Sequence, residues 1–264
     1  MATDTATTTR IGFVGLGNMG GNMATRFLTA GYPVYGEERS RAHADHLVQH
    51  GLQWRDTPRE VAEAVEMVIT SLPDERVRAH GGTMLDAPVS GSVPQVQAGA
   101  LTIMVGGDER AYATVEPILR ELGSPTHIGE NGHGLVLKLA INISLAVQML
   151  AFAEGLLLAE RGGIDPGAAG EVMAGSPIGS PMLKARLPLI LDLPDEAWFD
   201  VGLMQKDIVL ALEAARELGV PLPSAAAADE MLTLARAHGH EHHDLAALFQ
   251  TLRQLAGERL RAPT

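Results

Sequence analysis

The chain has 264 residues, of which 46% are hydrophobic and 20% are charged, a composition typical of a globular protein with one large or two smaller domains. The formal net charge of −12 leaves no basic face for a nucleic-acid backbone, and the absence of cysteine excludes disulfide bonds and thiol catalysis. The polar N-terminus lacks the apolar core of a signal peptide, and the longest apolar run, 145–158, is broken by Gln148 and Glu154. We therefore expect a cytoplasmic protein with neither a membrane partner nor a nucleic-acid partner.

Strand and helix signals alternate through the first half of the chain. Thr57 and Glu60, with Pro58 at the first helical position, form a capping box, and Asp108 caps a later helix. Four helices are predicted, ending near residues 28, 50, 65 and 122. Apolar strands are predicted at residues 10–15, 32–38, 66–73, 83–89, 101–107 and 126–129. This alternation predicts a mostly parallel sheet covered by helices on both faces.

The second half shows only helical patterns after Gly134. A long helix is predicted to reach residue 161, and N-cap and proline pairs at 165–166 and 180–181 begin two shorter helices. Further helices are predicted at 203–218, 223–237 and 244–255. We therefore predict an α/β domain of residues 1–129 and an all-helical domain of residues 130–264, with no flexible linker between them.

The sequence GLGNMG follows the first predicted strand and opens a helix, which is the context that a dinucleotide fingerprint requires. Gly15 allows the tight turn, Gly17 lets the backbone approach a pyrophosphate, and Gly20 lets the helix pack against the strand. The pyrophosphate charge would meet the helix N-terminus. An ordinary glycine-rich turn is the alternative. We favour a cofactor site that includes Gly15, Leu16, Gly17, Asn18, Met19 and Gly20.

An acidic residue, Glu37 or Glu38, ends the second predicted strand, about twenty residues after the glycines. A carboxylate at this position holds the ribose hydroxyls of NAD, and its charge repels the 2′-phosphate of NADP. Arg39 follows directly and could instead bind that phosphate. We expect NAD or NADP as the cofactor and favour NAD.

Lysine is rare in this chain, because only Lys138, Lys184 and Lys206 occur among 20 basic residues. Lys138 and Asn142 are four residues apart and share one face of the long apolar helix. Burial lowers the pKa of a lysine from about 10.4, and a value near neutrality suits the proton transfer in alcohol oxidation by a nicotinamide. The alternatives are a lysine whose stem covers apolar surface and a hydrogen-bonded anchor at the start of the helix.

Five sequence blocks resemble the β-hydroxyacid dehydrogenases, the family of 3-hydroxyisobutyrate dehydrogenase and tartronate semialdehyde reductase. The blocks follow the order of the family and span most of the chain: IGFVGLGNMG (11–20), LDAPVSG (85–91), LTIMVGGD (101–108), GHGLVLKLAIN (132–142) and QKDIVLALEAARELGVPLP (205–223). The resemblance implies a Rossmann-type, doubly wound parallel sheet followed by an all-α domain, with a long interdomain helix between them. It also implies a homodimer or homotetramer built through the helical domain.

The resemblance implies roles for the polar residues of the helical domain. Lys138 is the expected catalytic acid/base, and Asn142 is expected to assist it. Lys206 is expected to close over the nicotinamide and the substrate, with Asp207 beside it as a further substrate-binding residue. Two of the three lysines therefore fall on expected functional positions.

The resemblance also implies roles for residues of the α/β domain. Ser90 and Gly91 are expected to hold the carboxylate of a small carboxylic-acid substrate, and Leu72 and Pro73 to line the adenosine side of the cofactor. The chain departs from the family pattern at Ser92, where a second glycine is usual, and the added hydroxymethyl group could retune substrate choice. A second departure, isoleucine at position 141 in place of a frequent asparagine, leaves the Lys138–Asn142 spacing intact.

A third departure is a short segment before the LDAPVSG block. Only ten residues, 75–84, are available, close to the minimum of about 10–12 for one parallel crossover. Family members carry a further strand and helix here, including a loop that touches the nicotinamide side of the cofactor. Either the chain is truly shortened here, or a segment has been left out and the residues on its two sides are numbered consecutively. We favour the second and expect a break in the chain between Arg76 and Gly82.

The ten histidines of the chain do not predict a metal site. His238–Asp244 contains four of them, but ligands so close in sequence rarely complete a tetrahedral sphere, so we expect a solvated loop. His43, His46 and His50 share one helix face and are expected at the surface.

We therefore expect an NAD(P)-dependent oxidoreductase that interconverts a small β-hydroxyacid and its semialdehyde or keto acid. One alternative is an imine reductase on the same fold, against which Lys138 argues because those relatives usually replace the lysine. Another is a non-catalytic dinucleotide-binding protein.

Overall fold

The structure is a computed structural model that describes residues 9–71 and 82–257. Contacts within the chain define two compact units, Met1–Leu135 and Val136–Thr264, and the predicted boundary after residue 129 stays a prediction. The expected chain break falls almost wholly outside the described residues, as do Leu72 and Pro73.

The first unit contains a four-stranded parallel sheet. Its strands are β1 (Ile11–Val14), β2 (Val34–Glu37), β3 (Gln53–Trp54) and β4 (Met67–Thr70), in the order β3-β2-β1-β4. All pairs are parallel, and β1, which is paired along both edges, is buried at all four residues. The sequence predicted three of these strands, whereas β3 is too short to leave a pattern.

A second sheet in the same unit contains β5 (Val89–Ser90), β6 (Leu101–Gly106) and β7 (Gly123–Gly129) in the order β5-β6-β7. The strands β6 and β7 are parallel, but β5 is antiparallel to β6. The strand predicted at 83–89 is wrong over most of its length. Only an isolated bridge from Asp86 to Gly106 precedes β5, because Pro88 has no N–H with which to continue the ladder. The predicted single sheet is therefore two sheets in the described residues.

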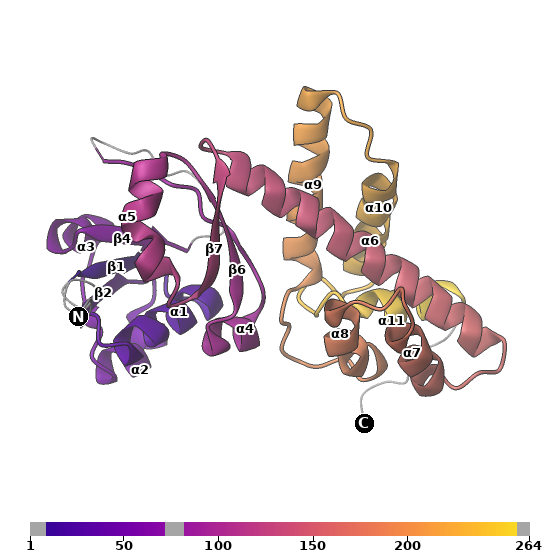
Figure 1. The fold of residues 1–264 in the computed structure, drawn as a ribbon. Helices are drawn as coiled ribbons and strands as arrows, with labels where there is room; N and C mark the ends of the chain where they lie inside the picture. Colours follow the sequence, from indigo (N-terminus) through magenta and orange to yellow (C-terminus); the bar gives the residue numbers. More distant parts are fainter. Residues whose placement is uncertain (1–8, 72–81, 258–264) are drawn as a thin grey trace. The chain divides into compact units, whose positions relative to one another are not determined.

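Helices pack around these sheets (Figure 1). Thr57 caps the helix Pro58–Ala64, since its Oγ1 accepts from the backbone N–H of Glu60 at 3.2 Å. Asp108 caps the helix Glu109–Leu119 by accepting from the backbone N–H of Ala111 at 2.8 Å, and both caps are as predicted. The helices of this unit are α1 (Asn18–Thr29), α2 (Arg41–Gln49), α3 (Pro58–Ala64), α4 (Val93–Ala98) and α5 (Glu109–Leu119).

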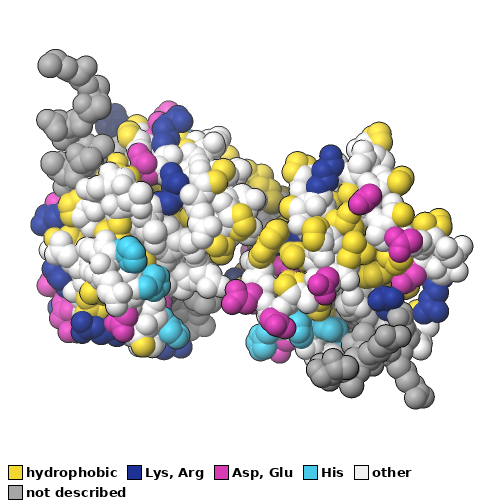
Figure 2. Space-filling view, turned by 90° about the horizontal axis from the view of Figure 1, so that it is seen from below, with side chains coloured by type: hydrophobic (Ala, Val, Ile, Leu, Met, Phe, Trp, Pro, Cys, Tyr) yellow, Lys and Arg dark blue, Asp and Glu magenta, His cyan; other side chains and the backbone are white. Residues whose placement is uncertain are grey.

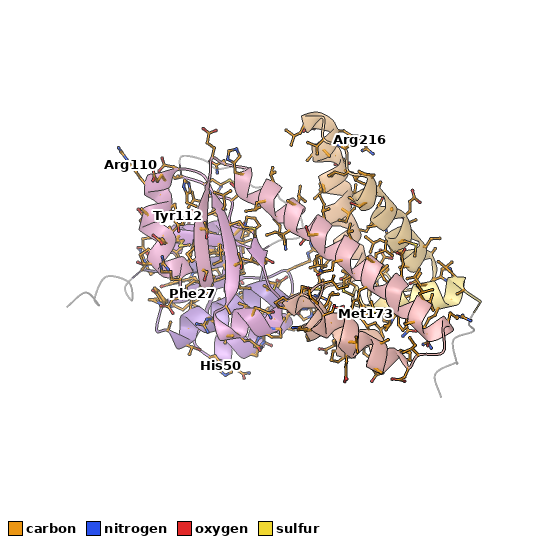
Figure 3. The ribbon with its side chains drawn as sticks, turned by 45° about the vertical axis from the view of Figure 1, so that its right-hand side comes forward. Phe27, His50, Arg110, Tyr112, Met173 and Arg216 are labelled. Atoms are coloured by element: carbon orange, nitrogen blue, oxygen red, sulfur yellow. The ribbon has the colours of Figure 1, made fainter. Side chains whose placement is uncertain are left out.

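One apolar core joins the two sheets of this unit. Phe27 of α1 packs 6.1 Å from Phe13 and 5.5 Å from Tyr32, measured between ring centroids (Figure 3). Arg26, also on α1, donates from Nε to the carbonyl of Glu121 at 2.6 Å and from Nη1 to that of Gln97 at 2.9 Å. The helix that follows the glycine turn is therefore held on both sides.

In the described part of the second unit, residues 136–257, helices are joined by loops, and the β-pairing is limited to an isolated bridge between Asp200 and Asp244. Asp165 and Ser180 cap the helices Pro166–Gly175 and Pro181–Leu191, and the helix Val201–Leu218 runs beside the helix Pro223–Ala237 (Figure 1). The helices are α6 (His133–Arg161), which begins in the first unit, α7 (Pro166–Gly175), α8 (Pro181–Leu191), α9 (Val201–Leu218), α10 (Pro223–Ala237) and α11 (Ala247–Leu255). The predicted class, a Rossmann-type sheet followed by an all-α domain, is confirmed.

The predicted solvated loop at 238–244 is confirmed in part, because His238 and His242 are exposed, whereas His240 and Asp244 are buried. Asp244 is fully buried and accepts from Arg186 Nε at 3.2 Å and from the backbone N–H groups of Trp198 and Phe199. His240 is 7% exposed. These hydrogen-bond partners stabilise the buried charge of Asp244 at the end of the loop. The surface position predicted for His43 and His46 of α2, and for His50 at its C-cap, is confirmed.

The helix α6 is long and apolar enough to cross a membrane by length and composition, with a mean hydropathy of 1.9. The sequence predicted no membrane span, because only the interrupted run 145–158 was considered. The apolar turns on either side of that run extend the helix to the length of a span. Core helices of water-soluble proteins meet the same criterion, although only 28% of this window is buried.

Candidate active site

The glycine turn has the backbone geometry that its sequence predicts. Gly15 has a φ of +93°, and a Cβ at Gly20 would lie 2.2 Å from the Gly15 carbonyl oxygen, so neither position accepts a side chain without strain. Around Gly17 a Cβ would meet nothing within 4 Å. This residue is the N-cap of α1, and the first turn of α1 carries no acidic side chain. The turn thus offers an approachable backbone and a positive helix end, which fit a pyrophosphate.

The side chain of Glu38 is hydrogen-bonded to this turn. Its Oε2 accepts from the backbone N–H of Leu16 at 2.7 Å, and its Oε1 accepts from that of Arg39 at 2.8 Å. Burial, with the charge of Glu38 beside it, raises the pKa of Glu37. Between the two acids, the structure therefore selects Glu38 as the carboxylate at the glycine turn. The Arg39 side chain is exposed.

A buried carboxylate that sequence reasoning missed, Asp86, holds the start of α6. Its Oδ1 accepts from the backbone N–H of Gly132 at 2.7 Å, and its Oδ2 accepts from that of Leu135 at 3.0 Å. A negative charge at a helix N-terminus is stabilising. Asp86 is 46 residues before Gly132, so no local capping pattern could reveal it.

The SGS segment forms a sharp turn at the end of β5. Gly91 has a φ of +133°, and a Cβ there would lie 2.8 Å from the side chain of Leu101, so glycine is required. Ser92 donates from its hydroxyl to Gln95 Oε1 at 2.7 Å and from its backbone N–H to the same oxygen at 2.9 Å. The Ser92 hydroxyl, which the family pattern lacks, is therefore hydrogen-bonded at the N-terminus of α4. Ser90, the last residue of β5, is half-buried.

Four predicted residues of the helical unit form one polar group between α6 and α9. Asn142 is 1% exposed, and its Nδ2 donates to Asp207 Oδ2 at 2.6 Å. The other oxygen of Asp207, Oδ1, lies 3.2 Å from Lys206 Nζ. Lys138 lies one turn before Asn142 on the same face of α6.

Burial lowers the pKa of Lys138 from its ordinary value. The charge of Asp207 opposes this effect, and the charge of Lys206 adds to it. A lysine in this setting gives up its proton more readily than a lysine in water, which is the property that acid/base chemistry requires.

A cavity of ≈ 430 Å³ in the helical unit lies away from this polar group. It is lined from α6 by Ile143, Val147 and Ala151, and from α7 by Met173, which Figure 3 labels. At 3.6 residues per turn, these α6 positions point away from the face that carries Lys138. The cavity is therefore not the site of the expected chemistry. Among the described residues, no group of three or more histidine, aspartate or glutamate side chains could hold a metal ion.

Profiles of two known domains match the chain. One, described as the NAD-binding domain of 6-phosphogluconate dehydrogenase, matches in two stretches, residues 10–78 and 73–130. The other, described as NAD-binding of NADP-dependent 3-hydroxyisobutyrate dehydrogenase, matches residues 132–252. The chain is also 32% identical to 3-hydroxyisobutyrate dehydrogenase of Pseudomonas aeruginosa, over 90% of this chain and 95% of that protein. The chain belongs to the β-hydroxyacid dehydrogenase family.

Other members of the family show the same breadth of similarity. The 2-hydroxy-3-oxopropionate reductase of Escherichia coli is 30% identical over 95% of this chain and 99% of that protein. That alignment runs over 291 residues, more than the 264 of this chain, so the relative carries residues without a counterpart here. The structure of 3-hydroxyisobutyrate dehydrogenase from Mycobacterium tuberculosis with L-serine has a TM-score of 0.80 and 28% identity, and the match covers 93% of this chain and 99% of that one.

A structure of an imine reductase from Pseudomonas sp. shares the fold alone, with a TM-score of 0.57 and 22% identity. The protein is thus an NAD(P)-dependent oxidoreductase of the β-hydroxyacid dehydrogenase type.

Proposed function

We propose that this dehydrogenase interconverts a small β-hydroxyacid and its semialdehyde or keto acid, with Lys138 as the acid/base. The observation that carries the proposal is the half-buried Lys138, whose pKa is lowered, on the helix face that also presents Asn142. When bound, NAD(P) supplies the hydride acceptor. Lys138 Nζ takes the hydroxyl proton of the substrate in oxidation and returns a proton in reduction.

The substrate carboxylate is assigned to the turn after β5. Ser90 offers a hydroxyl, and the positive φ of Gly91 turns the backbone directly after it. Both residues match the DAPVSG block of the family. The hydroxyl of Ser92 is engaged with Gln95, which favours a capping role over a substrate contact.

NAD is the proposed cofactor because of Glu38. Its carboxylate is fixed at the glycine turn by the N–H of Leu16, where it can accept hydrogen bonds from ribose hydroxyls and would repel a 2′-phosphate. Replacing Glu38 with glutamine keeps the shape and removes the charge. We expect Glu38→Gln to lower the preference for NAD over NADP about tenfold, measured as the ratio of the two kcat/KM values. An unchanged ratio would contradict this assignment.

We propose that a second copy of the chain packs against the exposed apolar surface of the helical unit. Figure 2 shows hydrophobic side chains gathered on this unit, and Leu158, Val172 and Ile178 are each more than two-thirds exposed. Lys138 and Glu154 interrupt α6, which favours a protein partner over a bilayer. Sedimentation should show a dimer or tetramer, and a monomer at micromolar concentration would contradict this. The cytoplasmic location stays a prediction.

A dinucleotide-binding protein without turnover is the second candidate. The N-terminal profile matches in two stretches that overlap at residues 73–78, and the relatives carry additional residues, which fits a chain that lacks the further strand and helix of the family. Imine reduction has no such support, since the likeness to an imine reductase shows the fold alone.

The deciding experiment is a substrate panel. It contains 3-hydroxyisobutyrate, glycerate, threonate, 3-hydroxypropionate and 4-hydroxybutyrate, each with NAD and with NADP, together with cofactor titrations by fluorescence. We expect NADH formation with at least one hydroxyacid, and Lys184→Ala, which changes an exposed lysine of α8, to match the wild type. Cofactor binding without reduction of the nicotinamide by any of the five would replace the dehydrogenase proposal with the second candidate.

A further inference from the structure

The carboxylate of Asp207 bridges two side chains of the proposed active site. One oxygen accepts from Asn142 Nδ2 at 2.6 Å, and the other lies 3.2 Å from Lys206 Nζ. The Asp207 side chain is 14% exposed, and Asn142 is almost fully buried. Both oxygens are therefore engaged within the protein, which leaves Asp207 poorly placed for the substrate contact that the family resemblance implies.

The hydrogen bond to Asp207 fixes the orientation of the Asn142 amide, that is, the direction of its NH₂ group and of its oxygen. An ionised carboxylate can only accept hydrogen bonds, so the amide must turn its NH₂ group toward Asp207. The amide oxygen then points away from Asp207 and remains an acceptor. Without this carboxylate, the two ends of the amide could exchange places.

We propose that Asp207 is a positioning residue, which fixes the Asn142 amide so that its oxygen can accept an N–H of the Lys138 amine. The inference rests on the proposed role of Lys138 as acid/base. A neutral amine has two N–H groups and one lone pair, so holding one N–H orients the lone pair that takes the substrate proton. In the oxidation, the O–H bond of the substrate breaks, its proton joins the lone pair on Nζ, and the ammonium so formed keeps its hydrogen bond to Asn142.

The same arrangement sets the charge around Lys138. The charged side chains that act on Lys138 are Asp207 and Lys206, both from α9. Asp207 raises the pKa of Lys138, whereas burial and the charge of Lys206 lower it. Loss of the Asp207 charge should therefore move the titration of Lys138 to lower pH, and loss of the Lys206 charge should move it to higher pH.

A matched control exists on the same helix. Gln205, next to Lys206, donates from its Nε2 to Asp229 Oδ1 of α10 at 3.0 Å, which is a second bond between an amide and a carboxylate. Asp229→Asn therefore makes the same chemical change as Asp207→Asn and disturbs the packing of α9 without touching Asn142. A merely structural role for Asp207 predicts similar behaviour of the two variants.

The first test combines kinetics with lysine NMR. Because the chain has only three lysines, side-chain labelling gives three signals, which can be assigned with single substitutions. For Asp207→Asn we expect kcat to fall about 10- to 100-fold with a much smaller change in KM, and Lys138 to titrate at lower pH than in the wild type. Asp229→Asn should lower thermal stability and leave kcat and the Lys138 titration unchanged. Wild-type kcat and titration in Asp207→Asn, or equal effects of the two variants, would overturn the proposal.

An exchanged pair keeps the proposal testable if a single variant is unstable. Asn142→Asp alone brings two carboxylates together, whereas Asn142→Asp combined with Asp207→Asn restores one donor and one acceptor. We expect the double variant to have a higher kcat than either single variant. Recovery of thermal stability without recovery of kcat would show that the bond is only structural.

The NMR titration also separates this inference from the proposed function. If no hydroxyacid is oxidised but Lys138 still shifts in Asp207→Asn, the dehydrogenase proposal fails and the coupling of Asp207 to Lys138 stands. If a hydroxyacid is oxidised and Lys138 does not shift, the positioning proposal fails alone.

Discussion

The proposed function gives the two units of the protein different chemical tasks. The glycine turn of the first unit offers backbone amides and a helix end, and its one carboxylate, Glu38, is held by the backbone N–H of Leu16. The polar group of the second unit consists of side chains, and its lysine has a pKa that burial lowers. A site made of backbone depends on steric access, whereas a site made of ionisable side chains depends on pH and on partners far away in the sequence. Variants should therefore damage the two halves in distinguishable ways.

The largest expected effect separates chemistry from cofactor binding. Lys138→Ala removes the acid/base but leaves the glycine turn unchanged. We expect kcat to fall about 100- to 10,000-fold while the dissociation constant of the cofactor changes little. Steady-state kinetics and fluorescence titration measure the two quantities. Equal losses of turnover and of binding would break the comparison, because the two units could not then be assigned separate tasks.

The next largest effect tests the steric nature of the glycine turn. Gly17→Ala adds a Cβ that meets nothing within 4 Å of the protein, whereas Gly20→Ala places one 2.2 Å from the Gly15 carbonyl. We expect Gly17→Ala to keep its stability and lose cofactor affinity, and Gly20→Ala to lose about 1–3 kcal/mol of stability as well. Thermal unfolding and cofactor titration distinguish them. Wild-type affinity in Gly17→Ala would remove this turn from the cofactor site.

A smaller effect tests whether the second unit is the pH-sensitive half. Burial, together with His243 and His238, lowers the pKa of His240 from its ordinary 6.5. The unfolded chain therefore binds a proton more readily than the folded one, and stability should fall as pH drops below 6.5 towards the lower folded pKa. His240→Asn should weaken this acid dependence of the melting temperature, and His43→Asn, on the exposed face of α2, should not. Identical slopes in all three proteins would contradict the assignment.

The smallest effect concerns the departure at Ser92. Its hydroxyl bonds to Gln95, so Ser92→Ala should cost about 1 kcal/mol of stability and leave the KM for the hydroxyacid unchanged. Urea unfolding and KM measurements across the substrate panel check both. A changed order of substrates would restore the role in substrate choice that the family comparison suggests.

The sequence predicted features whose cause is local. The bounds of α10 and the end of α6 agree with the predicted residues, because proline starts and apolar periodicity are local signals. The shared face of Lys138 and Asn142 follows from their spacing. Their partner could not be predicted from a pattern, since Asp207 is 65 residues from Asn142 and only the packing of α9 on α6 brings it there.

The errors have the same origin. Residues 83–89 have the composition of a strand, yet Asp86 is needed at the start of α6 and Pro88 cannot donate to a ladder. The loop at 238–244 is exposed in part, as predicted, yet Asp244 at its end is buried and pairs with Arg186 inside the unit. In both cases a distant partner outweighs the local preference.

The most direct test of the central claim is the pH dependence of kcat for hydroxyacid oxidation. The neutral amine of Lys138 is the form that the proposal requires for oxidation, so kcat should rise with pH and become constant at high pH. The apparent pKa of this rise should lie below 10.5, the ordinary value for lysine. This rise should be absent from the residual activity of Lys138→Ala. The same rise, at the same pH, in the variant would show that another group carries the proton.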